Sequence, residues 1–165
     1  MKTLCLNAII SVFLLVNSNG ILAQATQTKL NQVELMKQWI GSWRTEGTYI
    51  SSEIHSYGID GLEGFQRTQF KDSIASEHKF IYGYDKKTDK YISASIGKNN
   101  SGVLLMIFWF TSDNNCERIP LEYISNPEQA TSKAIYEFKS KDLIVATFKE
   151  KNKPDRTYTI TREKK

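Results

Sequence analysis

Cysteine is scarce in this chain, whose 165 residues include only Cys5 and Cys116. Cys5 lies in an N-terminal segment with the order of a secretory signal peptide, so we expect only Cys116 to remain after export. An exported domain with one cysteine has no internal disulfide, and its core must provide its stability unaided. Cys116 stands in the polar sequence TSDNNCER without a paired His or a basic pocket, so we expect an unreactive bystander thiol on a loop.

The same N-terminal segment lacks an apolar run long enough to span a bilayer. Lys2 precedes an apolar stretch over residues 4–16, which is shorter than the roughly 20 residues that a spanning helix needs. A polar break follows, and then Ala-Gln-Ala at residues 23–25, with small residues where signal peptidase cuts. We predict a signal peptide over 1–25 and a mature domain over 26–165 that is periplasmic or secreted and not membrane-spanning.

Motifs that dictate a reaction are also missing. The chain has no G-x-S-x-G elbow, no credible Ser-His-Asp trio, no phosphate loop and no dinucleotide fingerprint. The two histidines, His55 and His78, lack cysteine support for a metal site, so we expect neither a metal nor another cofactor. The net charge of +4, from 22 basic and 18 acidic side chains, does not suit a nucleic-acid-binding domain. The sequence favours a protein without catalysis.

One segment has the period of a helix. Residues 28–40 place Leu30, Val33 and Met36 on one face, and Gly41 stands where a helix would end. After Gly41 the apolar period changes to two, and turn sequences separate the segments too closely for crossover helices. The rest of the chain is therefore predicted to be antiparallel β-structure.

The number of these segments predicts the architecture. A closed up-and-down barrel, plugged at one end by the helix, leaves no strand edge unpaired; the alternative is an open sandwich. We predict an all-β fold, an antiparallel barrel of nine or ten strands with a short N-terminal helix. The expected strands cover residues 43–50, 74–82, 90–97, 102–110, 118–125, 133–139, 143–150 and 156–163, with one or two irregular strands between Glu53 and Phe70.

Two short motifs resemble those of a known family. WIGSWRTEG, residues 39–47, resembles the start of a calycin or lipocalin-type barrel, where a Gly-x-Trp motif follows a short helix; the matching residues are Gly41 and Trp43. The resemblance implies a late Arg that packs over this Trp and closes the barrel, and the matching candidate is Arg162. FIYGYDKKTDKY, residues 80–91, is similar to the GYD-turn-Y hairpin of small exported bacterial proteins with a lipocalin-like domain of unknown function.

Aromatic residues are abundant, with 8 Tyr, 8 Phe and 3 Trp. Such side chains either fill a core or line a cavity. We expect the apolar run 103–110, including Trp109, to belong to the core. We predict that the barrel binds a small, largely apolar ligand inside. The candidate pocket residues are Tyr49, His78, Phe80, Tyr82, Tyr136 and Phe138.

Two other functions stay open. In one, the barrel is solid and its loops bind a partner or an acidic polysaccharide, with help from exposed aromatics such as Tyr57 or Tyr91. In the other, the barrel is a lyase or isomerase that uses His78. His78 shares a predicted face with Ile74 and Phe80 and would project into the barrel, but a register slip of one residue would turn it to solvent.

Overall fold

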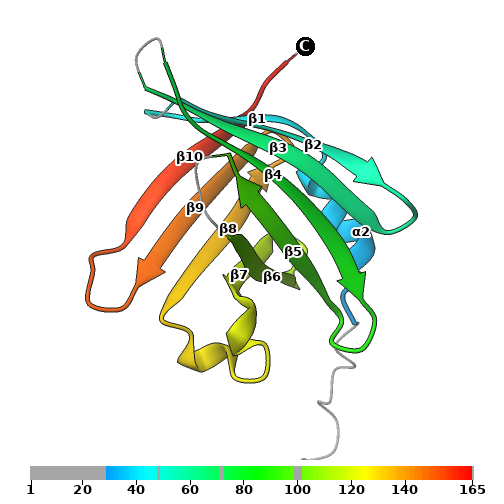
Figure 1. Cartoon of the computed structure of the whole chain (residues 1–165). Coiled ribbons are helices and arrows are strands. Elements are labelled where there is room, and N and C mark those ends of the chain that lie inside the picture. The colour runs from blue at the N-terminus through cyan, green and yellow to red at the C-terminus, as the bar shows by residue number, and fades with distance from the viewer. Residues whose placement is uncertain (1–28, 48, 71–72, 99–101, 165) are drawn as a thin grey trace, which may run out of the picture.

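The computed structural model describes residues 29–47, 49–70, 73–98 and 102–164, so the predicted signal peptide lies outside the described residues. The strands pair antiparallel in chain order, and the last strand returns to pair with the first. Figure 1 shows this closure, with β10 in red beside β1 in cyan. The predicted all-β barrel is confirmed. Its ten strands are β1 (Gly41–Thr45), β2 (Tyr49–Tyr57), β3 (Gly61–Phe70), β4 (Ser73–Asp85), β5 (Lys90–Gly97), β6 (Val103–Ser112), β7 (Asn115–Pro120), β8 (Ser132–Ser140), β9 (Leu143–Glu150) and β10 (Arg156–Arg162).

The N-terminal helix is shorter than the predicted span. α2 (Gln32–Met36) begins after Asn31, whose side chain accepts a hydrogen bond from the Glu34 backbone N–H and caps the helix. A single 3-10 turn, η1 (Lys37–Trp39), completes it. Leu30 contributed to the predicted period, but it lies before the helix and packs against the core from there. None of the helices among the described residues has the length and hydropathy needed to cross a bilayer.

Three strand predictions needed correction. The strand predicted over residues 43–50 is divided between two strands, because β1 ends at Thr45 and β2 begins at Tyr49. The stretch after Glu53 forms two regular strands, β2 and β3, rather than irregular ones. The strand predicted over residues 118–125 ends at Pro120, which has no N–H to extend the ladder, and it begins earlier, at Asn115. Two 3-10 turns, η2 (Leu121–Tyr123) and η3 (Pro127–Gln129), lead from there to β8.

The β4–β5 turn shows what the GYD-turn-Y motif does structurally. Asp85 accepts hydrogen bonds from the Thr88 hydroxyl at 2.6 Å and the Lys87 backbone N–H at 3.2 Å, and these bonds hold the pKa of Asp85 below its usual value. Tyr91 was expected to be exposed, but it is 2% exposed and donates a hydrogen bond to the Asp60 carbonyl at 2.7 Å. Burial raises the pKa of Tyr91 to about 12. This tyrosine therefore joins two neighbouring turns.

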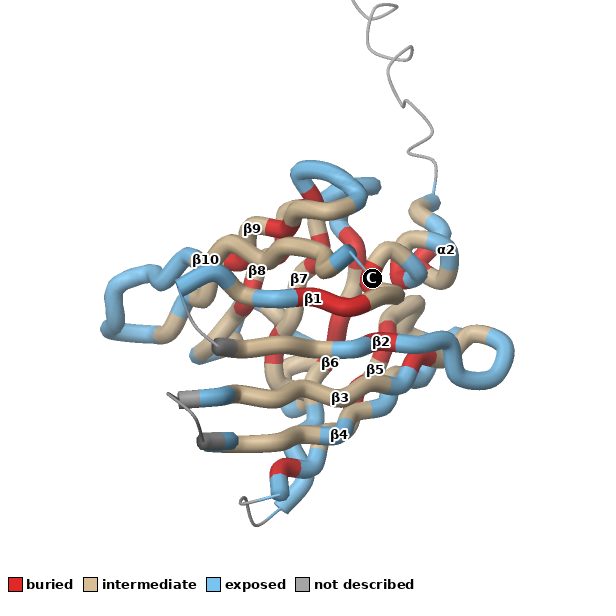
Figure 2. The backbone as a smooth tube through the Cα atoms, turned by 90° about the horizontal axis from the view of Figure 1, so that it is seen from above, coloured by how far each residue is buried: buried red, intermediate tan, exposed pale blue. Residues whose placement is uncertain are grey.

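Two glutamines fix the helix to the end of the barrel. The buried Gln32 amide donates to the Phe110 carbonyl at 2.9 Å and accepts from the Phe110 N–H at 2.7 Å. Gln38 donates to the Asp113 carbonyl at 2.9 Å, in the turn between β6 and β7. Met36 and Trp39 enter the core beneath. Figure 2 shows that buried positions gather on the side of the barrel near α2, while the far parts of β2–β4 are intermediate or exposed.

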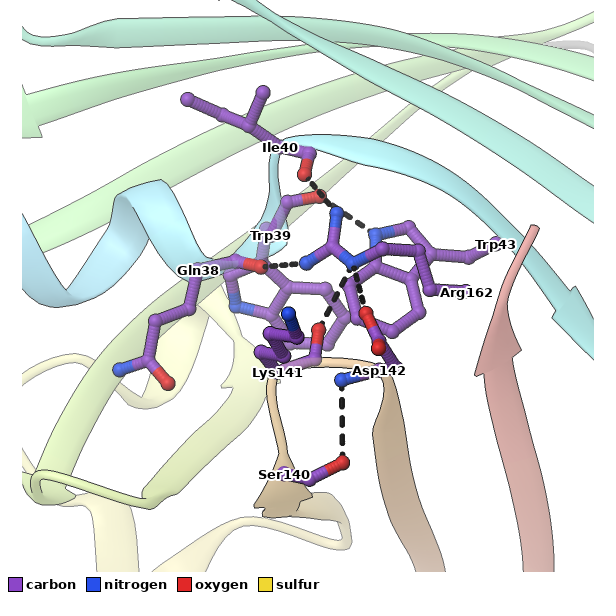
Figure 3. Close-up of polar contacts among 8 residues, drawn as sticks. All are labelled: Gln38, Trp39, Ile40, Trp43, Ser140, Lys141, Asp142 and Arg162. Carbon is purple, nitrogen blue, oxygen red and sulfur yellow. Dashed lines mark hydrogen bonds and ion pairs between the residues drawn. The ribbon is translucent and has the colours of Figure 1, made fainter. Parts of the chain in front are cut away.

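Arg162 connects four parts of the chain at this closed end. Its guanidinium carbon lies 4.1 Å from the Trp43 ring centroid. Its nitrogens donate to the backbone carbonyls of Gln38 at 3.1 Å, of Lys141 at 2.8 Å and of Ile40. Figure 3 shows the guanidinium among these carbonyls and over the indole. The contacts join the last strand to the first strand, to η1 and to the β8–β9 turn.

Gly41 makes room for this arginine. Its φ of +135° lies in a region that L side chains rarely adopt. A Cβ atom at position 41 would also collide with Nη1 of Arg162. Glycine at the first position of the Gly-x-Trp motif is therefore required both by the backbone and by the packing of Arg162.

We predict that Arg162→Met lowers the free energy of unfolding by about 2–4 kcal/mol, because charged hydrogen bonds contribute roughly 1.5–3 kcal/mol and a cation–π contact about 1. Arg162→Lys should recover part of this loss, since it keeps the charge but not the planar donor fork. Urea denaturation measures both. The control is Arg44→Met, which removes an exposed ion pair with Glu163 and should cost less than about 1 kcal/mol. Equal losses at the two arginines would contradict the assigned role.

Candidate functional site

The barrel interior is hollow. A cavity of about 460 Å³ lies inside it, lined by side chains from all ten strands and by Trp39 at the closed end. This volume falls within the roughly 300–1,000 Å³ that is usual for small-molecule sites. The aromatic residues therefore do not fill the whole interior.

Strand register places a polar row on one wall of this cavity. Ser52 on β2 is opposite Gln66 on β3, which is opposite His78 on β4, and all three line the cavity. Ser93 and Ser95 on β5 line it too, opposite Tyr82 and Phe80. The small serines leave the volume open and supply hydroxyl groups that can bind a ligand.

A wall of aromatic rings meets this polar row. Phe80, Tyr82 and Phe108 contact one another in sequence, with edge-to-face ring centroids 5.4 and 5.0 Å apart. On β8 and β9, Tyr136 and Phe148 repeat the arrangement at 6.2 Å. Edge-to-face packing holds each ring in a preferred geometry. This part of the cavity is therefore apolar and already organised before any ligand binds.

The candidate pocket residues divide between the cavity and other places. His78, Phe80, Tyr82 and Tyr136 line the cavity. The structure places Phe138 in the core instead, with its ring centroid 5.1 Å from that of Trp39 at the closed end. Tyr49 belongs to β2, but its side chain lies outside the described part of the structure. Alternation thus predicted the inward face of Phe138 but not its depth along the barrel.

His78 lines the cavity inside the barrel. The strand therefore has the register in which His78 faces inward, and not the one shifted by one residue that would turn it to solvent. Ile74, which was expected to share its face, is instead 50% exposed. The reason is an irregularity in the β3–β4 pairing, where Thr68 is opposite Ser76 but Gln69 is opposite Ile74. The extra residue at this bulge turns the start of β4 by one position.

The cavity contains a cation that the sequence reasoning missed. Arg118 on β7 lines the cavity, and its Nε is buried without a hydrogen-bond partner. Its guanidinium carbon lies 5.4, 5.8 and 5.9 Å from the ring centroids of Phe148, Tyr136 and Phe108. One feature of the sequence could have indicated that Arg118 faces inward. It lies two residues after a cysteine, so the two side chains share a face of the strand, and cysteine is among the most buried residue types.

Two phenols stand close to this guanidinium. Burial raises the pKa of Tyr82 and of Tyr136 above the ordinary value, although the charge of Arg118 acts in the opposite direction at both. The two hydroxyl groups therefore stay protonated at any physiological pH. They are neutral donors on the cavity wall, next to a permanent positive charge.

Two further expectations about single residues were wrong. Cys116 lies on β7 rather than on a loop, and it is fully buried. Of the run 103–110, only Ile107, Phe108 and Phe110 are buried, while Trp109 lies half-buried under Lys90, with Nζ 5.3 Å from the ring centroid. The outer face of β6 is thus largely at the surface rather than in the core.

We predict that the Cys116 thiol does not react with Ellman's reagent in the folded protein, because burial excludes the reagent and raises the pKa of the thiol. The measurement uses a Cys5→Ser background, in which Cys116 is the only thiol. Reaction in denaturant, at one thiol per chain, is the positive control. Rapid reaction under native conditions would contradict the buried position.

Within the described ranges, His, Cys, Asp and Glu side chains do not gather in groups of three that could hold a metal ion. No model of a known protein family matches the chain, and no curated protein is significantly similar to it. The resemblance to calycin and lipocalin-type barrels therefore stays a prediction that rests on the Gly-x-Trp motif and the GYD-turn-Y hairpin.

Proposed function

We propose that this protein is exported and binds a small, largely apolar molecule inside its barrel, in the periplasm or outside the cell. The observation that supports the proposal most directly is the cavity of about 460 Å³, which is lined by aromatic rings and by a polar row. A closed barrel that only needed stability would gain by filling this volume, because empty space forfeits packing contacts.

The wall chemistry favours a ligand that is mostly apolar. Rings such as Phe80, Tyr82 and Phe108 present apolar surface whose removal from water contributes roughly 25 cal/mol per Å². Since the rings already pack against one another, little ordering is required when a ligand enters. His78, Gln66 and the serines supply a few polar contacts that can set the orientation of the ligand.

We predict that N-phenyl-1-naphthylamine, an uncharged probe that fluoresces in apolar surroundings, binds the wild-type protein, and that Ser95→Phe weakens this binding at least about ten-fold. Ser95 lines the cavity on β5, so a phenyl group there occupies ligand space. Fluorescence titration measures the dissociation constants. Tryptophan emission gives a second signal, since Trp39 and Trp43 line the same cavity.

The matched control is Ala94→Phe. Ala94 adjoins Ser95 but lies on the alternate face of β5, outside the cavity lining, so the same added phenyl group should leave probe binding unchanged. Failure of the wild-type protein to bind the probe would contradict the proposed function. If the probe binds, native mass spectrometry of protein purified from its host, followed by extraction, identifies any natural occupant of the cavity.

A further inference from the structure

We propose that the ligand of this cavity carries an anionic group, a carboxylate or a similar oxyanion, which Arg118 binds while the apolar remainder packs against the aromatic wall. The inference rests on the proposed function and specifies the class of ligand. Its starting point is the unpaired Nε of Arg118, buried at the cavity wall. A charge in such a position is costly unless it is paired and hydrogen-bonded.

No carboxylate among the described residues compensates Arg118. Glu117, its neighbour on β7, pairs with Lys133 at 2.9 Å. Glu150, which lines the adjoining hollow, pairs with Lys153 and with Arg156. These acidic groups are engaged elsewhere, and the Arg118 charge is left for a group that comes from outside.

The aromatic neighbours of Arg118 do not replace an anion. Phe108, Tyr136 and Phe148 contribute cation–π attraction through their faces. The donors of a guanidinium lie in its own plane, however, and need oxygen atoms as acceptors. The three rings therefore hold the side chain in place and lower the cost of its charge, while Nε stays unsatisfied.

The charges around the cavity are of one sign. Arg118 and Arg156 are the only permanently charged side chains of the described cavity lining, which includes no Asp or Glu. A second hollow of about 340 Å³ shares both arginines and adds Lys133, Lys149 and Glu150. Lys133, Lys149 and Arg156 are paired with carboxylates, so Arg118 is the cation of these two hollows that lacks an anionic partner among the described residues.

The hydroxyl groups of Tyr82 and Tyr136 complete the chemistry. Both side chains line the cavity near Arg118, and both stay neutral donors. A carboxylate accepts hydrogen bonds from a guanidinium and from phenols, but it cannot donate any. The combination selects an oxyanion over an alcohol or an amine of the same apolar shape.

The test compares decanoate with decanol, which share an apolar chain but differ in charge. Each displaces N-phenyl-1-naphthylamine from the cavity, and fluorescence reports the competition at neutral pH. In Arg118→Met, decanoate should bind about 10- to 100-fold more weakly, the range expected for a lost charged hydrogen bond. Decanol and the uncharged probe should bind as they do to the wild type. Acetate, which has the carboxylate alone, should not compete.

Two variants serve as controls. Arg44→Met removes one positive charge from the outer surface, where Arg44 pairs with Glu163, and should leave decanoate binding unchanged. Arg118→Lys keeps the charge without the planar fork and should restore part of the affinity. Met is close to Arg in length and fits among the aromatic rings, so the melting temperature of Arg118→Met should not fall.

The outcomes separate this inference from the proposed function. Equal binding of decanoate by the wild type and by Arg118→Met, with the probe still bound, overturns the role of Arg118 and leaves apolar binding intact. A lower melting temperature together with unchanged decanoate binding also overturns it and assigns Arg118 to the stability of the barrel. If the wild type binds neither the probe nor decanoate, the proposed function itself is wrong.

Discussion

The barrel depends on how Arg162 joins its last strand to its first. A sheet of ten strands that closes on itself has no exposed edge, but only if β10 meets β1 in the right register. Arg162 lies directly opposite Trp43 in that pairing and stacks on its ring, while its donors engage the carbonyls at the end of η1. One side chain therefore links strand closure to the end of η1, and no disulfide among the described residues supports this link.

Arg162 and Arg118 differ in whether their hydrogen-bond donors have acceptors within the protein. Arg162 donates hydrogen bonds to three backbone carbonyls and lies 3.3 Å from Asp142, so both its charge and its donors are satisfied. Arg118 lies against three aromatic rings, but its Nε has no acceptor. Buried polar groups that stay unsatisfied are rare in native proteins and need an explanation. The oxyanion that we propose as part of the ligand would supply one for Arg118.

The sequence predicted the features that depend on local patterns. Period-two alternation was enough for the barrel, and the Gly-x-Trp motif led to Trp43 and Arg162 as neighbours. The same patterns failed on β7, where the strand was predicted to begin at residue 118 and Cys116 was assigned to a loop, although β7 begins at Asn115. Arg118 and Cys116 were missed for this reason, since their burial depends on long-range packing.

Depth along the barrel axis decides whether an aromatic residue fills the core or lines the cavity. Near the helix, Trp39, Phe110 and Phe138 meet and leave the closed end solid. Farther along, small residues lie beside the rings on neighbouring strands: Ser93 and Ser95 are opposite Tyr82 and Phe80, and the missing side chain of Gly64 leaves room for Phe80. Larger side chains at these serine and glycine positions would take up part of the cavity. The aromatic residues thus fill the core at one end of the barrel and line the cavity at the other.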